Sequence, residues 1–417
     1  MNSNVLRGAL IGVVSVMIGA MLIALGFMAA VLTQDDAPAA GAPPEPTLTG
    51  TEIADEDFGI LAEIARILQQ DYVDPEDADP GRLRQGAIDG IFRILDDPHS
   101  SYVDPETYAL SRDDFEGHFS GIGATVSQEG DWIVIVRPLP DTPAERAGVE
   151  SGAIILEVDG ERADGWSVQQ AVTRIRGPIG TEVTLRLRYR DGTEHEVTVE
   201  RDEIAVSSVS TEPIGGELLD GNEEAVDDIA YIRIRSFTRT TPQELEHAIR
   251  EAEEAGARGI ILDVRSNPGG LLHETLSVAD MLLDEGTVVV QRHRDGSEQV
   301  AEAREGMVTD LPIALLQDQF SASGSELLAA ALQENGRAIV VGTRSFGKGS
   351  VNHVRELSDG GAVYVSIARW LTPDLNQIEG RGVLPDVEVE DTLEDLEAGR
   401  DVVAQRAVEA LREQLGG

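Results

Sequence analysis

The chain has 417 residues, with 33 lysines and arginines against 76 aspartates and glutamates, and a formal net charge of -43. This acidity disfavours nucleic acids and anionic lipid headgroups as partners. The sequence has no cysteine, which excludes disulfides, cysteine nucleophiles and thiolate metal sites, and its seven histidines lack the spacing of metal ligands. The length predicts two or three domains, and we expect neither a metal nor any other cofactor.

The N-terminal segment is predicted to enter a membrane. Residues 8–32 carry no charge, and this run is longer than the roughly 7–15 apolar residues of a signal-peptide core. Because Arg7 precedes the run, we expect residues 1–34 to be a retained anchor and the rest of the chain to be exported. Ala-Pro-Ala at 37–39 also fits a cleavage site, so a removed signal is the alternative. Residues 35–50, rich in Ala and Pro, follow as a linker.

Residues 51–119 are predicted to form an N-terminal helical region. Apolar residues recur at helical spacing in two stretches, one from Phe58 to Leu68 and one from Leu83 to Leu95. Asp-Asp-Pro-His-Ser at 96–100 ends the second stretch. His99 is a candidate base in this turn, but its position favours a structural role.

Residues 120–203 read as short strands separated by turn signals, which predicts a small barrel. Its opening loop, Gly121-Ile122-Gly123-Ala124, would direct backbone N–H groups into a concavity that holds a carboxylate. The adjoining strand edge and the helix predicted at 167–175 would form a groove for an extended peptide. Together with Pro-Ala-Glu-Arg-Ala-Gly-Val at 143–149, these segments resemble a PDZ domain in the circularly permuted arrangement of bacterial proteases. The alternative is a glycine-rich hairpin that binds nothing.

Strands and helices alternate in residues 204–390, which predicts a mainly parallel sheet covered by helices. Residues 391–417 are predicted to be a C-terminal amphipathic helix that serves packing or oligomer contact. We therefore expect a multidomain protein of mixed α+β and α/β class. It would combine an N-terminal helical region, a permuted PDZ β-barrel and a strand–helix core.

Lys348 is the only lysine of the sequence, and it stands between two glycines in a loop that follows a predicted strand. A desolvated lysine can lose its proton and act as a base, which arginine cannot do. An ordinary glycine-rich turn is the alternative. A phosphate-binding loop from Gly342 to Lys348 would need Ser or Thr at the next position, where Gly349 stands, and a helix where the pattern predicts strands. Nucleotide binding is therefore disfavoured.

Two further loops carry candidate chemistry. The Pro-Gly-Gly turn at 268–270 presents backbone N–H groups suited to an oxyanion hole, unless it is only a tight turn that requires positive φ. Serines in Ser-Ala-Ser-Gly-Ser-Glu at 321–326 precede a helix, where serine acts as an N-cap or as a nucleophile. If Lys348 is the base, burial must lower its pKa against the net charge of -43, so we expect a dry site largely free of carboxylates. His353 is the alternative base.

These loops together resemble the carboxyl-terminal processing peptidases, also called tail-specific proteases, over about residues 57–386. The matching segments are the PDZ segments above, Leu-Asp-Asp-Pro-His-Ser-Ser-Tyr at 95–102, Arg-Ser-Asn-Pro-Gly-Gly-Leu-Leu at 265–272, Ser-Ala-Ser-Gly-Ser-Glu at 321–326, Ser-Phe-Gly-Lys-Gly-Ser-Val at 345–351, Thr-Pro-Asp at 372–374 and Gly-Val-Leu-Pro-Asp at 382–386. In this order the motifs are specific for the family, which implies that residues 204–390 are a serine protease core.

The resemblance implies a serine–lysine dyad, with Ser323 as the nucleophile and Lys348 as the base. It places the oxyanion-binding N–H groups at Gly269 and Gly324. Two positions depart from the family pattern. The glutamine that usually stands four residues after the lysine, and orients its amine, is Asn352 here, whose side chain is one methylene shorter. The alanine that usually follows the nucleophile is Gly324.

We therefore expect a single-pass, membrane-anchored serine endopeptidase whose catalytic part is extracytoplasmic, in the periplasm or at the cell surface. Its PDZ groove would recognise the C-terminal tails of exported proteins, and cleavage would follow near those tails. The expected partners are protein or peptide tails and the membrane, but not nucleic acid, and a homo-oligomer is left open. The alternative is a catalytically silent PDZ scaffold that binds peptides, which Asn352 would favour.

Overall fold

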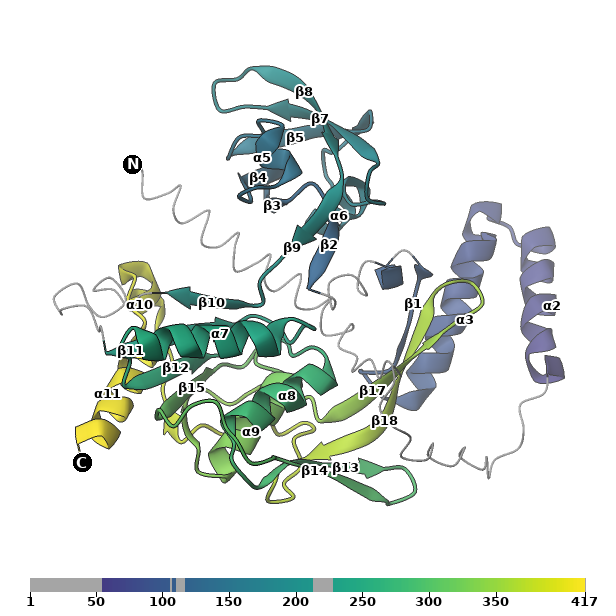
Figure 1. Ribbon diagram of the computed structural model, residues 1–417. Helices are drawn as coiled ribbons and strands as arrows, with labels where there is room; N and C mark the ends of the chain where they lie inside the picture. The colour runs from purple at the N-terminus through teal and green to yellow at the C-terminus, as the bar shows by residue number, and fades with distance from the viewer. Residues whose placement is uncertain (1–54, 106, 110–116, 213–227, 417) are drawn as a thin grey trace.

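The computed structural model describes residues 55–105, 107–109, 117–212 and 228–416 (Figure 1). The predicted anchor and linker, residues 1–50, lie outside these ranges. Among the helices within them, none combines the length and the apolar character that crossing a bilayer requires.

The first elements of the described residues are helices. They are α2 (Asp55–Asp71), the short η1 (Pro75–Ala78) and α3 (Pro80–Leu95). The two long helices, α2 and α3, lie side by side (Figure 1). Many of their apolar side chains are exposed on the surface, with Ile94 84% exposed. After α3, β1 (Ser101–Val103) pairs with β18 (Ala362–Leu371), so a sheet joins this region to the core.

An antiparallel sheet with two short helices follows. Its strands run in the order β3 (Ala124–Glu129), β4 (Trp132–Pro138), β5 (Ala153–Val158), β7 (Glu182–Arg188) and β8 (Glu194–Glu200), with β6 (Glu161–Arg162) paired to β5. The helices are α5 (Pro143–Arg146) and α6 (Val168–Ile175). A reciprocal capping box of Ser167 and Gln170 starts α6, which packs on β3 and β5. Alternate residues of β7 point inward and are fully buried, as a half-buried strand requires.

A two-stranded ribbon connects this sheet to the larger core (Figure 1). It consists of β2 (His118–Gly121) and β9 (Asp202–Ala205), paired antiparallel. The incoming and outgoing chain therefore run together at one end of the PDZ-like sheet.

The larger core is built on a six-stranded sheet. Its strands run in the order β10 (Val209–Glu212), β11 (Ile229–Ile234), β12 (Gly259–Asp263), β15 (Ile313–Gln317), β16 (Ala338–Gly342) and β19 (Val387–Glu388). From β11 to β19 neighbouring strands are parallel, and β10 is antiparallel to β11.

Helices cover both faces of this sheet because its strands are apolar on both sides. One face packs against α7 (Thr241–Glu254), α8 (Leu272–Leu282) and α9 (Gly324–Glu334). The other face packs against α11 (Val402–Gly416), which follows the short α10 (Leu393–Ala398). Within β12, Ile260 and Leu262 face the first layer and Ile261 faces the second. The C-terminal segment therefore serves packing within the chain.

A second sheet stands beside α9. It runs in the order β1, β18, β13 (Thr287–His293) and β14 (Glu298–Glu302), and β17 (Ser350–Glu356) also pairs with β18. The β17–β18 register shifts between Val351 and Asn352. Because β17 begins two residues after Lys348, this sheet anchors the far side of the lysine loop.

Candidate active site

Three loops follow three neighbouring parallel strands, β12, β15 and β16. The carboxyl ends of parallel strands meet at one edge of a sheet, so the Pro-Gly-Gly turn, the serine run and the lysine loop gather there. The backbone N–H of Ala322 donates to the carbonyl of Asn267 at 3.0 Å, and that of Phe346 donates to the carbonyl of Ser321 at 3.0 Å. Each loop is thus hydrogen-bonded to the next.

Of the three serines in the run, Ser323 is the one left partly exposed. Ser321 donates its hydroxyl to the carbonyl of Val264 at 2.8 Å, and Ser325 donates to that of Asn267 at 2.9 Å, and both are buried. Ser323 stands at the N-terminus of α9 with φ 52°, a left-handed conformation that costs a non-glycine residue about 1–3 kcal/mol. Geometry alone therefore singles out Ser323 as the candidate nucleophile.

Glu326, which sequence analysis did not single out, joins the serine loop to the lysine loop. Its buried carboxylate accepts hydrogen bonds from the backbone N–H groups of Ser323 and Lys348, each at 2.8 Å. It also accepts from the N–H of Gly347 and the hydroxyl of Ser345, each at 2.6 Å. Burial raises the pKa of Glu326, and these donors oppose that shift. The Ser-x-x-Glu spacing, typical of a capping box, was the signal available in the sequence.

Lys348 is 1% exposed, although lysine is rarely buried. Burial lowers the pKa of the Lys348 ammonium from 10.5 to about 7, although the carboxylates of Glu379, Glu326 and Asp97 oppose the shift. The expectation that the site would be largely free of carboxylates is therefore wrong. The loss of hydration outweighs three negative charges, and near pH 7 a large share of the amine is neutral.

The glycines around Lys348 allow another loop to lie against it. Gly347 has φ 96°, and its carbonyl accepts from the N–H of Gly380 at 2.8 Å. A Cβ on Gly349 would lie 2.3 Å from the backbone N of Glu379. The N–H of Gly349 donates to Oε2 of Glu379 at 3.0 Å. Any larger residue at position 349 would push this carboxylate away.

Asn352 is buried, and its amide bonds to two neighbours. Its Nδ2 donates to the backbone carbonyl of His99, and its Oδ1 accepts from the hydroxyl of Ser350 at 3.2 Å. Nε2 of His99 lies 3.1 Å from Oε1 of Glu379. The turn at 96–100 is therefore part of the lysine's surroundings, which supports a structural role for His99. The alternative base His353 is only partly buried.

The Pro-Gly-Gly turn is held by Asn267, whose Oδ1 accepts from the N–H of Gly269 at 2.8 Å and whose Nδ2 donates to the carbonyl of Ile234 at 3.0 Å. Gly269 has φ 104°, which favours glycine. Its N–H is thus occupied within the loop, and binding an oxyanion would require sharing or exchange with Asn267. Gly324 is the first residue of α9, where the backbone N–H groups have no acceptor within the helix and are directed beyond its N-terminal end.

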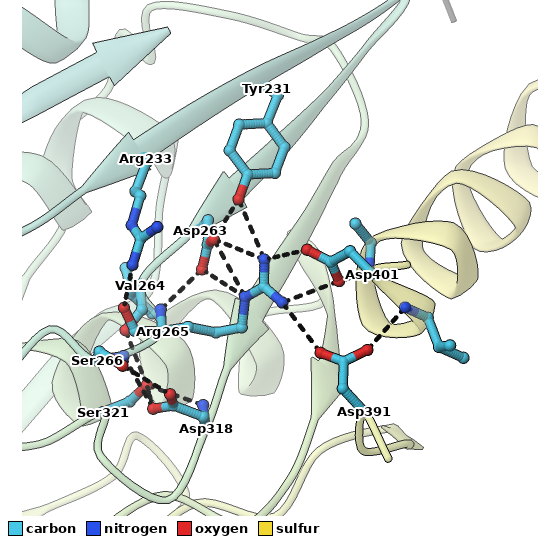
Figure 2. A network of polar contacts seen from close by, with 12 residues as sticks. Tyr231, Arg233, Asp263, Val264, Arg265, Ser266, Asp318, Ser321, Asp391 and Asp401 are labelled. Atoms are coloured by element: carbon cyan, nitrogen blue, oxygen red, sulfur yellow. Dashed lines mark hydrogen bonds and ion pairs between the residues drawn. The ribbon is translucent and has the colours of Figure 1, made fainter. Parts of the chain in front are cut away.

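A buried ionic network lies at the end of β12, just before this turn in the sequence, and Figure 2 shows its members. Arg265 bonds to Asp263 at 2.9 Å and to Asp401, at the start of α11, at 2.7 Å. Burial alone would raise the pKa of Asp263, but the charge and hydrogen bonds of Arg265 lower it overall. Asp391 lies 3.8 Å from the same guanidinium. The C-terminal helix is therefore tied to the base of the candidate oxyanion turn.

In the PDZ-like sheet, Gly121, Ile122, Gly123 and Ala124 line one hollow. The other lining residues are mainly apolar and come from β2–β5 and α6: Phe119, Val126, Ile135, Ile155, Val172, Ile175 and Arg176. Both the backbone conformation and the close packing of this loop require glycine at position 123. Gly123 has φ 74°, and a Cβ there would lie 2.4 Å from Cβ of Thr142, whose hydroxyl donates to the Gly123 carbonyl at 2.9 Å.

No cluster of three or more His, Asp or Glu side chains within the described ranges is arranged to hold a metal ion.

Family models match most of the chain. Residues 228–389 match "Peptidase family S41", residues 134–188 match "PDZ domain", and residues 20–107 match "Activating protease CtpB N-terminal domain". The carboxy-terminal processing protease CtpA of Bacillus subtilis is 35% identical over 337 residues, which cover 81% of this chain and 70% of that protein.

The chain belongs to the carboxy-terminal processing proteases of peptidase family S41. It is a serine-type peptidase with a PDZ domain, as the motifs predicted. A carboxy-terminal-processing protease of Bartonella bacilliformis is 37% identical over 352 residues, covering 83% of this chain and 77% of that protein. Among solved structures, the photosystem II D1 C-terminal processing protease is similar at 27% identity with a TM-score of 0.47, covering 81% of this chain and 94% of that one.

Proposed function

We propose that this serine peptidase uses a Ser323–Lys348 dyad and cleaves exported proteins near their C-termini after its PDZ domain binds the tail. One observation carries the dyad: a lysine whose pKa is about 7 lies on a loop that Glu326 ties to the backbone of Ser323. A general base works best when its pKa lies near the working pH.

In the proposed reaction the neutral amine of Lys348 accepts the proton of the Ser323 hydroxyl. Oγ attacks the scissile carbonyl carbon, and the resulting oxyanion is bound by the N–H groups of Gly269 and Gly324. The ammonium then returns the proton to the leaving amine as the C–N bond breaks, and water hydrolyses the acyl-enzyme by the same route. Losing one oxyanion donor typically costs roughly 3 kcal/mol in the barrier.

For Gly269 this role requires its N–H to turn from Asn267 toward the substrate. The hydrogen bond of 2.8 Å to Asn267 would hold the turn in shape until substrate arrives. For Asn352, we propose that the shorter side chain supports Lys348 through its bonds to His99 and Ser350.

In the PDZ domain, we propose that Gly121, Ile122, Gly123 and Ala124 bind the tail's terminal carboxylate and that the apolar hollow takes its last side chain. The sheet order would correspond to the circularly permuted PDZ arrangement, with residues 120–203 as this domain and 204–390 as the protease core. Residues 1–34 would anchor the enzyme in the cell membrane, with the catalytic part outside the cytoplasm.

Cleavage by the full-length protein tests the dyad. We expect digestion of fluorescein-labelled casein by wild type, and loss of at least about a thousandfold in rate for both Ser323→Ala and Lys348→Ala. A reporter peptide with a free apolar C-terminus should compete with digestion, whereas the same peptide with an amidated C-terminus should not. Full activity in either variant would overturn the dyad.

A silent PDZ scaffold is the second candidate, because Asn352 is one methylene shorter than the glutamine that usually stands at this position. It predicts binding of the free-carboxylate peptide without any cleavage. Asn352→Gln separates the two: faster cleavage indicates a slow enzyme, and no cleavage in either form supports the scaffold.

A further inference from the structure

We infer that Glu379 is a positioning residue for Lys348 and that its charge, balanced by Arg369 and in hydrogen-bonding contact with His99, determines the pH range in which the lysine acts as a base. The inference rests on the proposed dyad and deepens it. Glu379 lies outside the serine, lysine and Pro-Gly-Gly motifs and comes from a loop after the last long strand of the second sheet.

The contacts of Glu379 place it against the lysine loop from one side. Its Oε2 accepts from the N–H of Gly349 at 3.0 Å and from Arg369 at 2.7 Å. Its Oε1 lies 3.1 Å from Nε2 of His99. The carboxylate is therefore held by a residue adjacent to Lys348, by β18 and by the turn that precedes β1.

Glu379 remains ionised at neutral pH in this setting. Burial pushes its pKa upward, but the hydrogen bond and charge of His99 and the charge of Arg369 lower the pKa overall. A negative charge near an ammonium favours the protonated form, and among the three carboxylates that face Lys348 the effect of Glu379 is the largest. Glu379 thus opposes the burial that leaves the lysine amine largely neutral, and so able to accept a proton, near pH 7.

The other two carboxylates are less suited to this role. Glu326 has its oxygens committed to four donors in two loops, so it is needed for the geometry of both. Asp97 accepts from the hydroxyl of Ser100 at 2.7 Å and from the N–H of His99 at 3.0 Å, which shape its own turn. Glu379 is the carboxylate whose partners besides the lysine loop, His99 and Arg369, lie on separate elements.

Opposite substitutions should move the pH profile in opposite directions. Glu379→Gln keeps an oxygen that can accept from Gly349 but removes the charge. We expect the acid limb of kcat/KM to move to lower pH by about half a unit or more. Arg369→Gln leaves the Glu379 charge less compensated, so the limb should move to higher pH.

The experiment measures kcat/KM of the full-length protein on fluorescein-labelled casein from pH 5 to pH 9 (about one point per half unit). Glu334→Gln is the matched control: it removes one negative charge from a carboxylate that accepts from Asp374 and Asn376 and does not face the lysine. Its acid limb should coincide with that of wild type. The inference would be overturned if the acid limb of the Glu379→Gln variant coincided with that of wild type while its activity was lower at every pH. Glu379 would then be a purely structural residue.

Failure of the dyad itself would look different. If Lys348→Ala keeps wild-type activity, the proposed function is wrong whatever Glu379 does. If Lys348→Ala is inactive and Arg369→Gln and Glu379→Gln both leave the limb unmoved, the dyad stands and only the present inference falls.

Discussion

The backbone N–H groups of Ser323 and Lys348 donate to the same oxygen, Oε2 of Glu326, each at 2.8 Å. The two loops that carry them follow adjacent strands, β15 and β16, and one buried carboxylate fixes their separation. The spacing of the proposed dyad is therefore set by backbone hydrogen bonds to one carboxylate.

Glu326→Gln should disable the enzyme without removing a reactive group. A glutamine amide replaces one oxygen by a donor, so two of the four donors lose their acceptor, at a cost of about 1–3 kcal/mol of stability for each. A shift of about 1 Å between the loops is worth roughly a hundredfold in rate. Casein digestion and thermal unfolding check both effects, and wild-type kcat in this variant would contradict the role of the carboxylate.

The pH dependence of wild type should report the lysine. Only the neutral amine accepts a proton, so kcat/KM should fall below a midpoint near pH 7, about tenfold for each further pH unit. His353→Gln should leave this limb in place because His353 is not the proposed base. A limb that disappears in His353→Gln would transfer the role of base to the histidine.

Lys348→Met should stabilise the protein while abolishing activity. The folded-state pKa of Lys348, about 7, lies below its ordinary value of 10.5, so unfolding takes up a proton between these pH values. The free energy of unfolding of wild type therefore rises with pH across this window, and the burial penalty is fully present below pH 7. We expect Lys348→Met to gain at most about 5 kcal/mol at pH 6–7. The gain should shrink toward pH 10, and a gain independent of pH would contradict the assigned shift.

Asp401→Asn should weaken the tie between α11 and the Pro-Gly-Gly turn. It removes one of the carboxylates around the Arg265 guanidinium in Figure 2, and breaking a buried pair typically costs about 3–5 kcal/mol. We expect a lower Tm and a lower kcat, with KM less affected. Glu409→Gln, in an exposed pair with Arg406 on the same helix, should change the Tm little. Equal effects of the two substitutions would show that the network has no special role.

Gly324→Ala should be destabilising in this chain because a Cβ at position 324 would lie 2.6 Å from Oγ1 of Thr275. We expect a loss of about 1–3 kcal/mol. Thr275→Ala removes that hydroxyl, so the double variant should recover part of the loss in a double-mutant cycle measured by urea unfolding. Strictly additive effects would show that Thr275 is not the obstacle.

Much of the site was predictable from local patterns. Ser323 and Lys348 lie where strand–loop–helix and strand–loop–strand patterns placed them, and the parallel order of β12, β15 and β16 brings their loops together. Local sequence could not show Glu379, because its contact with the lysine loop depends on the path of a distant loop. The same holds for Arg265 and Asp401, which are 136 positions apart.

The charge of the site was mispredicted for a physical reason. Net charge is a property of the whole chain, whereas the pKa of Lys348 depends on whether water reaches the amine. Three nearby carboxylates do not keep the amine protonated, because each is held by other donors and the amine itself is dehydrated. Likewise, the occupied N–H of Gly269 depends on the rotamer of Asn267, which no sequence pattern reports.

The pairing of β1 with β18 also bears on when the enzyme becomes active. The lysine's surroundings include Asp97 in the turn at 96–100 together with Glu326 and Glu379, and His99 of that turn contacts Glu379 across 280 positions of sequence, so segments far apart in the chain must meet to complete them. Until then Lys348 is an ordinary solvated ammonium that cannot take a proton from Ser323. A chain in which these segments have not yet packed together would thus lack peptidase activity, and proteolytic competence would itself report that folding is complete.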